Sequence, residues 1–180
     1  MSRLSEDLES DVGFEAQYVR YRLPIYRTIR GIVLDASAAE DLTQETFERA
    51  YRHRGRQTVQ SAGPWLHRIA VNSAITHLRR QRLARLLPFR VTEYARPTDF
   101  ERVEARTVVT RALAALTPKL RVAVVLHFYA GMTRYEIAST LGIRPGTVAS
   151  RLGAAMAIMR GTLTETGRTD ALERLEHGAN

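Results

Sequence analysis

The sequence predicts an all-α protein with two small helical domains joined by an extended linker, the C-terminal one a helix-turn-helix. Apolar residues recur at three- and four-residue steps through most of the chain, which is the period of an amphipathic helix. This period is lost over residues 86–105, which contain two prolines. These observations predict domains at residues 1–85 and 106–163, a linker at 86–105, and a tail at 164–180.

The composition favours an anionic partner such as nucleic acid. The chain has 180 residues, 44% of them hydrophobic, with a net charge of +8 and a pI of about 10.5. Residues 1–50 carry 6 basic and 10 acidic groups, a net charge of −4, whereas residues 51–125 carry 15 and 4, a net charge of +11. Arginine supplies all the basic residues except Lys119. This bias suits phosphate and guanine contacts, but a GC-rich genome would produce it equally.

Several classes of protein are disfavoured. There is no cysteine, no apolar run long enough to span a membrane and no signal-peptide core, so we expect a cytoplasmic protein without disulfides. The five histidines show no metal-ligand spacing, and there is no glycine-rich phosphate loop. We therefore expect no enzyme activity, no metal and no cofactor.

The first helical stretch spans residues 14–33, where apolar residues from Phe14 to Ile32 step by three or four. Pro24 is expected to break or kink it, giving one or two helices. A short turn follows. Ser37 is the candidate N-cap of the next helix, with Glu40 three residues on in the pattern of a capping box.

Residues 38–51, AAEDLTQETFERAY, predict an amphipathic helix with an apolar side and a compact acidic and amide face. Such a face on its own is usually only solvated. In an otherwise basic chain it favours contact with two different partners. The acidic face consists of Asp41, Gln44, Glu45 and Glu48.

Residues 52–63 predict a basic loop, and a helix is expected from Pro64 to about Arg85. One side of this helix is apolar, while the other can lie along phosphates and present polar groups to bases. A surface helix rich in arginine for solubility is the open alternative. Trp65 is more often a core residue, yet beside a basic loop it can hold an unstacked base. The residues predicted on this second side are His67, Arg68, Asn72, Ile75, Thr76, Arg79 and Arg80.

The C-terminal part begins with a helix at residues 108–116 and a largely buried one from Pro118 that includes Phe128 and ends at Gly131. Thr133 and Glu136 form a second capping box. A short helix, a turn at Gly142 and a longer helix from Pro145 then predict a helix-turn-helix. The longer helix is expected to bury Val148, Leu152, Met156 and Met159, and a short helix in the tail is expected around residues 170–176.

Together these segments resemble the extracytoplasmic-function (ECF) sigma factors, the smallest bacterial transcription-initiation factors. AEDLTQETFERAY is similar to the family's core-binding helix, and WLHRIAVNSAITHLRR to its −10 recognition helix. The segment LAALTPKLRVAVVLHFYAGMTRYEIASTLGIRPGTVASRL is similar to its −35 domain. The resemblance covers nearly all of residues 14–162, in the family's order and spacing. It implies two helical domains, the first for core polymerase and the −10 element and the second for the −35 element.

The resemblance implies a partner for each surface. The acidic face matches residues that bind the β′ clamp helices of core RNA polymerase, and the family's second domain is expected at the β flap. The −10 region is expected to be captured as unpaired DNA, and the −35 element as duplex. An anti-sigma factor is a further expected partner. The −10 residues implied are Arg56, Trp65, Arg68, Asn72, Thr76, Arg79 and Arg80; those for −35 are Arg144, Thr147, Ser150 and Arg151.

Two departures from the family pattern concern the −35 helix. The family usually offers Lys or Arg where this chain has Ala149 and Ala154, which predicts weak or unusual −35 recognition. Arg144 stands before Pro145 where a serine-type N-cap is common, at a cost of roughly 1 kcal/mol in helix stability.

Two alternatives stay open from the residues alone. A stand-alone helix-turn-helix repressor or activator would bind duplex DNA tightly without polymerase at a pseudo-palindromic site. An adaptor that binds polymerase without reading DNA would tolerate substitutions at Asn72, Arg79 and Arg80.

Overall fold

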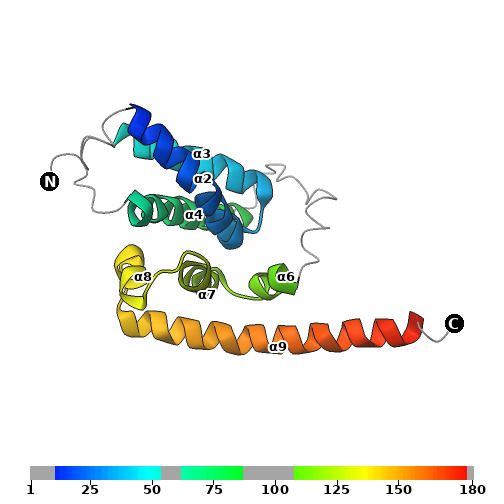
Figure 1. The fold of residues 1–180 in the computed structure, drawn as a ribbon. Helices are drawn as coiled ribbons and strands as arrows, with labels where there is room; N and C mark the ends of the chain where they lie inside the picture. Colours follow the sequence, from blue (N-terminus) through cyan, green and yellow to red (C-terminus); the bar gives the residue numbers. More distant parts are fainter. Residues whose placement is uncertain (1–10, 54–61, 87–107, 178–180) are drawn as a thin grey trace. The chain divides into compact units, whose positions relative to one another are not determined.

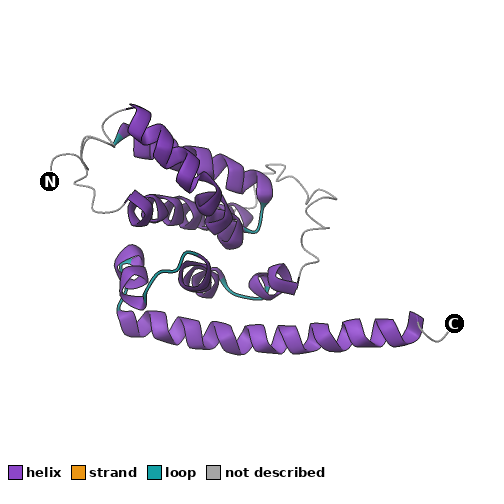
Figure 2. Ribbon diagram, viewed as in Figure 1, coloured by secondary structure: helices purple, strands orange, loops and turns teal. Residues whose placement is uncertain are grey.

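The computed structural model describes residues 11–53, 62–86 and 108–177, and every regular element within them is helical (Figures 1 and 2). These helices form two compact units, one made of α2 to α4 and the other of α6 to α9. The all-α, two-unit prediction is confirmed. Of the predicted linker, residues 87–105 lie outside the described ranges. The elements are α2 (Asp11–Val33), α3 (Ala36–Arg52), α4 (Ala62–Leu86), α6 (Val108–Ala114), α7 (Pro118–Val124), the π-helical segment η2 (Val125–Tyr129), α8 (Arg134–Leu141) and α9 (Pro145–His177).

In the first unit each of α2, α3 and α4 packs against the other two. The core is built from apolar residues at helical spacing, such as Ile25, Ile29 and Ile32 of α2, all fully buried. Of the two outcomes expected at Pro24, one helix or two, the structure has one, because α2 continues through the proline. Packing of the isoleucines that follow it compensates for the backbone hydrogen bond that proline cannot donate.

The turn between α2 and α3 differs from the prediction. The residue that caps α3 is Asp35, whose Oδ1 accepts a 2.8 Å hydrogen bond from the Ala38 N–H. Leu34 adopts a left-handed φ of 62°, so the chain reverses within two residues and reaches Asp35 in an extended conformation. Ser37 already lies inside the helix, so it is not the N-cap, and Glu40 is left exposed on the first turns of α3.

The second unit contains the predicted helix-turn-helix. The Thr133 N–H donates to Glu136 Oε2 over 2.8 Å and the Glu136 N–H donates back to Thr133 Oγ1 over 3.3 Å, which confirms the capping box. The Glu136 carboxylate accepts hydrogen bonds from the Thr133 N–H and, over 2.7 Å, from the Thr133 hydroxyl, and these two bonds lower its pKa because they favour the charged form. Gly142 ends α8 with a φ of 63°, a conformation that glycine adopts without strain. Ile137 and Val148 are fully buried between the helices.

Three details of the second unit correct the sequence predictions. Phe128 is 62% exposed, because the π-helical segment η2 shifts the helical register and turns this residue outward. On α9 the fully buried residue after Leu152 is Ala155, whereas Met156 is 36% exposed and Met159 only half-buried. The tail is also more helical than expected, since α9 runs without interruption to His177.

Arg121 is a buried cation that the sequence did not reveal. Its Nε and one terminal nitrogen donate hydrogen bonds to the carbonyls of Leu113 and Leu116, each over 2.9 Å. Leu113 lies in the last turn of α6 and Leu116 just after the helix ends, a position where a positive charge is favourable. Burial lowers the pKa of Arg121. The residue joins α6 to α7 and so stabilises the base of the helix-turn-helix.

Candidate functional site

The outer face of α3 carries the predicted acidic residues. Asp41, Gln44 and Glu48 are exposed and Glu45 is half-exposed, whereas Leu42, Thr43, Thr46 and Phe47 are buried on the opposite side. The structure thus places all four residues of the acidic face on one accessible side of the first unit. No helix within the described ranges has the length and apolar character needed to cross a membrane.

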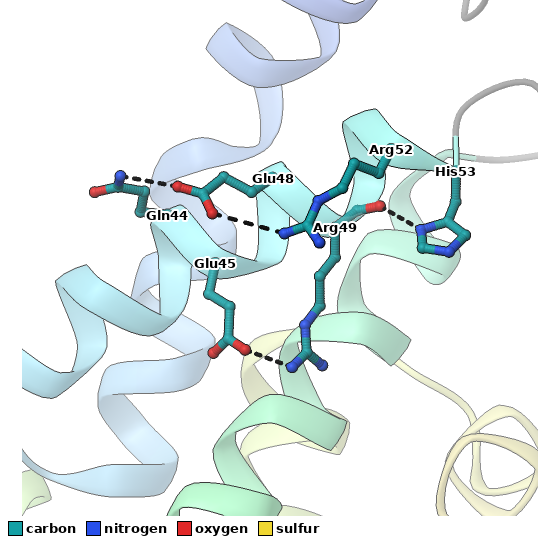
Figure 3. A network of polar contacts seen from close by, with 6 residues as sticks. All are labelled: Gln44, Glu45, Glu48, Arg49, Arg52 and His53. Carbon is teal, nitrogen blue, oxygen red and sulfur yellow. Dashed lines mark hydrogen bonds and ion pairs between the residues drawn. The ribbon is translucent and has the colours of Figure 1, made fainter.

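Much of the negative charge on this face is neutralised within α3 itself (Figure 3). Glu45 pairs with Arg49, and Glu48 pairs with Arg52 over 3.8 Å. Glu48 also accepts a 3.0 Å hydrogen bond from Gln44. Exposed pairs one helical turn apart stabilise a helix by only about 0.3–0.5 kcal/mol. Their consequence for binding is larger, because a partner must compete with these arginines for the two glutamates.

The exposed side of α4 forms a continuous polar stripe. Trp65 is half-exposed, and the residues that follow it at helical steps are exposed. Among the described residues, no carboxylate pairs with any arginine of the stripe. These cations are therefore available for phosphates. Arg56 lies outside the described residues. The stripe consists of Trp65, Arg68, Asn72, Thr76, Arg79 and Arg80.

His67 does not belong to the polar side of α4, where it was predicted. It is 9% exposed, its Nδ1 lies 2.9 Å from the Gly63 carbonyl oxygen, and its Nε2 is buried without a hydrogen-bond partner. Burial lowers the pKa of this imidazole, and the hydrogen bond to Gly63 opposes that shift only in part. The reason is helical geometry: His67 shares a face with the buried Ala70, Val71 and Ala74, three, four and seven residues further along.

The start of α4 is held close against α2. A Cβ at Gly63 would lie 3.0 Å from Cε1 and 3.2 Å from the hydroxyl oxygen of Tyr21. The aromatic side chain of Tyr21 thus packs where only glycine leaves room. This contact positions the first turn of α4, including Trp65, on the rest of the unit.

The predicted −35 residues cluster at the N-terminal end of α9. Arg144, Thr147 and Ser150 are exposed and Arg151 is half-exposed. Beyond them the surface carries small residues: Gly153 and Ala154 are both exposed, and a Cβ built on Gly153 would meet nothing within 4 Å. The structure therefore brings the four predicted residues together, and it places no long polar side chain on the next turn.

Comparison with family profiles divides the chain into the same two parts as the two compact units. Residues 17–84 match the profile of Sigma-70 region 2, and residues 106–159 match that of Sigma-70, region 4. The ECF RNA polymerase sigma factor SigL of Mycobacterium tuberculosis is 31% identical over 176 residues, covering 94% of this chain and 99% of the relative. The RNA polymerase sigma-E factor of Streptomyces antibioticus is 33% identical over 155 residues, covering 84% of this chain and 86% of the relative.

Two solved structures share the fold. One is a chain from the complex of CnrH with the cytosolic domain of CnrY, with a TM-score of 0.68, 21% identity and coverage of 90% of this chain and 96% of that one. The other comes from the complex of the sigma factor RpoE with the anti-sigma factor NepR from Bartonella quintana, with a TM-score of 0.68, 20% identity and coverage of 84% and 96%. At such identity the likeness concerns the fold alone.

Proposed function

This chain belongs to the ECF sigma factors of bacterial RNA polymerase, and from that premise we propose how its surfaces share the family's task of directing polymerase to promoters. The acidic face of α3 binds core polymerase. The polar stripe of α4 captures the −10 element as unpaired DNA. The N-terminal end of α9 contacts the −35 element as duplex.

The observation that carries this proposal is the contrast between two helices of one compact unit. The outer face of α3 presents carboxylates and an amide, whereas α4 presents arginines, Asn72 and Trp65. Opposite charges on neighbouring helices suit two partners of opposite charge. In a domain that bound only duplex DNA, an acidic face would not favour binding, since DNA phosphates would repel the carboxylates.

Core binding is assigned to Asp41, Gln44, Glu45 and Glu48, with the β′ clamp helices as the partner. The second domain is proposed to contact the β flap while it holds the −35 element. We infer domains at residues 1–85 and 106–163, with the linker 86–105 threading through polymerase and the tail 164–180 without an assigned role. Such a protein works in the cytoplasm and catalyses no reaction of its own.

Promoter opening is assigned to α4 and the loop before it. Extruding a base from a duplex costs a few kcal/mol. Stacking an unpaired base on an aromatic side chain contributes about 1–3 kcal/mol, and Trp65 is the aromatic residue on this stripe. Asn72 supplies hydrogen bonds to a base edge, while Arg56, Arg68, Arg79 and Arg80 hold the backbone. Binding energy for the open strand thus offsets unpairing.

An anti-sigma factor is a further proposed partner. The two structures of similar fold were determined as complexes, one of them with a protein named as an anti-sigma factor. A protein that covered the acidic face of α3 or the polar stripe of α4 would block polymerase or promoter binding.

The test combines retention on immobilised core polymerase with run-off transcription. Charge reversal at Asp41 and Glu45 to lysine should abolish both. Substitution of Asn72 and Arg79 by alanine should leave retention intact and reduce only the transcript. A wild-type protein that failed to bind core polymerase, yet bound duplex DNA tightly by itself, would contradict the proposal and favour a stand-alone repressor or activator.

A further inference from the structure

The first turn of α4 has a buried side and an exposed side. Ala62, Leu66 and His67 are buried. Trp65 lies on the other side and is half-exposed, next to the exposed Pro64. The direction in which the tryptophan ring faces solvent therefore depends on how this turn is seated on the rest of the unit.

One side chain of α2, Tyr21, lies directly against the backbone of this turn. A Cβ built on Gly63 would lie 3.0 Å from Tyr21 Cε1, 3.3 Å from its Cζ and 3.2 Å from its hydroxyl oxygen. Carbon atoms in ordinary van der Waals contact are about 3.5–4.0 Å apart. The edge of the tyrosine ring thus occupies the place that a side chain at position 63 would need. The guanidinium carbon of Arg20 lies 5.3 Å from the centre of the same ring, a favourable cation–π arrangement.

Two further features restrain the backbone at Gly63. Proline disfavours a helical conformation in the residue before it, in part through a clash with that residue's Cβ. Gly63 has no Cβ, so α4 includes it although Pro64 follows. Its carbonyl oxygen lies 2.9 Å from His67 Nδ1, and because a carbonyl oxygen only accepts, this nitrogen carries the hydrogen and donates it. Gly63 is thus the point at which α2, through Tyr21, contacts the turn that carries Trp65.

Tyr21 lies outside the isoleucine core that holds α2 in the unit. Ile25, Ile29 and Ile32 are fully buried, whereas Tyr21 is half-buried. Removal of the tyrosine ring leaves these isoleucines in place, so α2 should remain packed. The group that is lost is the one that fills the space beside Gly63. Because glycine has greater backbone freedom than any other residue, the first turn of α4 would then be less restrained.

We propose that Tyr21 is a positioning residue for capture of the unpaired −10 base. Through its contact with Gly63, it fixes the orientation in which Trp65 presents its ring. Stacking needs the face of the ring and the face of the base to be in contact. A tilt of the first turn therefore weakens stacking without removing any group that touches DNA. This inference rests on the proposed function and adds a residue of α2 to a site built from α4.

The first experiment measures the mobility of Trp65 without DNA. Trp65 is the only tryptophan in the sequence, so the tryptophan fluorescence of the full-length chain reports on it alone. Time-resolved anisotropy separates fast motion of the indole ring from tumbling of the protein. Tyr21→Leu should increase the amplitude of the fast motion about twofold, whereas Tyr21→Phe retains the ring and should keep the wild-type decay. Equal decays for Tyr21→Leu and the wild type would overturn the inference.

The second experiment measures base capture. The probe is a fluorescein-labelled single-stranded oligonucleotide with the non-template −10 sequence of a promoter selected by the wild-type holoenzyme. Trp65→Ala should weaken its binding to the holoenzyme about 5-fold to 150-fold, as expected for loss of one stacked base. Tyr21→Leu should weaken it at least about threefold, but less than Trp65→Ala, because it acts only through that residue. Wild-type affinity in Tyr21→Leu would contradict the assignment.

A double-mutant cycle tests whether Tyr21 acts through Gly63. Gly63→Ala displaces the ring without removing it, so it carries the same two predictions and replaces Tyr21→Leu if that variant is unstable. In the double variant, leucine leaves room for the alanine methyl group, and the loss of affinity should be at least about threefold smaller than the product of the separate losses. Independent losses would refute the contact as the cause. Gly161→Ala is the matched control, a helical glycine with nothing within 4 Å of its Cβ position, and it should leave strand binding unchanged.

The outcomes separate this inference from the proposed function. If Trp65→Ala binds the oligonucleotide as tightly as the wild type, base capture by this surface is wrong and the inference fails with it. If Trp65→Ala weakens binding while Tyr21→Leu behaves as Tyr21→Phe does in both experiments, the proposed function stands and only the inference is wrong. Circular dichroism confirms that each variant is folded.

Discussion

The two helices assigned to promoter DNA differ in what they offer it. On α4, a half-exposed tryptophan, an asparagine and a series of arginines follow one face for more than four turns. On α9, the readers Thr147, Ser150 and Arg151 occupy a single turn and are followed by Gly153 and Ala154. The proposed −10 helix, α4, therefore presents more polar side chains than α9 does, and most of them are longer.

This difference indicates where promoter specificity resides. A bidentate side chain discriminates between bases by about 1–3 kcal/mol, while short hydroxyls contribute neutral hydrogen bonds worth about 0.5–1.5 kcal/mol each. The proposed −35 helix has one arginine on this turn, so we expect it chiefly to hold the duplex in position. We then expect promoter selection to depend on unpaired bases captured by α4.

The strongest test of the contrast is removal of the −10 contacts. Asn72→Ala should lower run-off transcription about 5-fold to 150-fold, from the roughly 1–3 kcal/mol that a bidentate hydrogen-bonded contact to a base edge contributes. Ser150→Ala is the matched control at the −35 helix and should cost no more than about tenfold. A larger loss from Ser150→Ala than from Asn72→Ala would reverse the comparison.

The −35 helix should gain from a longer side chain. Ala154→Arg places a guanidinium on the exposed turn that now carries small residues, and it should tighten holoenzyme binding to a duplex −35 element about fivefold, or about 1 kcal/mol. The dependence of log affinity on log salt should steepen by about 0.9 if the new contact is to a phosphate. Unchanged affinity at every salt concentration would show that this turn faces away from DNA.

The position of α9 depends on the helix that precedes it. Thr133→Ala removes the hydroxyl that accepts from the Glu136 N–H and donates to the Glu136 carboxylate, and it should lower the free energy of unfolding of the second unit by about 1 kcal/mol. Ser139→Ala, an exposed serine on the same helix, is expected to change it by less than about 0.5 kcal/mol. Equal effects in thermal melts would mean that the cap stabilises nothing.

Gly153→Ala should have a smaller effect of opposite sign. The site has open space and helical backbone, so alanine should stabilise α9 by about 0.4–1 kcal/mol through reduced freedom of the unfolded chain. Denaturant unfolding measures this gain. Destabilisation would reveal a packing partner for this face of the helix.

The smallest expected effect concerns His67 in α4 and is a change in the pH dependence of the unfolding free energy. Because burial lowers the pKa of His67 in the folded state, the unfolded chain binds the proton more readily. The contribution of neutral His67 to the free energy of unfolding should be fully present above the pKa of the unfolded chain, about 6.5. It should decline as the pH falls from there towards the lowered pKa of the folded state. His67→Phe should flatten this part of the profile of unfolding free energy. An unchanged slope in that variant would exclude His67 as its source.

Local patterns were enough to predict much of the fold and of the surfaces. The capping box at Thr133, the left-handed turn at Gly142 and the exposed acidic residues of α3 depend on spacing within one helix. Helical spacing is visible in the sequence. The roles assigned to these surface residues stay predictions until they are measured.

Features that depend on a second element could not be predicted. The π-helical shift that exposes Phe128 and the carbonyl partners of Arg121 are set by tertiary packing. A pocket of about 360 Å³ between α2 and α3 was also missed, because its lining residues come from two helices, with Tyr18 on α2 and Asp41 on α3. For His67, comparison with Ala70, Val71 and Ala74 on the helical wheel would have indicated burial.

The central claim is best tested by selecting promoters from a randomised pool with the reconstituted holoenzyme. We predict a sharply defined −10 sequence and only a weak −35 preference, since α4 carries several long polar readers, whereas α9 carries Arg151 beside the short Thr147 and Ser150. A strict −35 sequence with an indifferent −10 region would contradict the account.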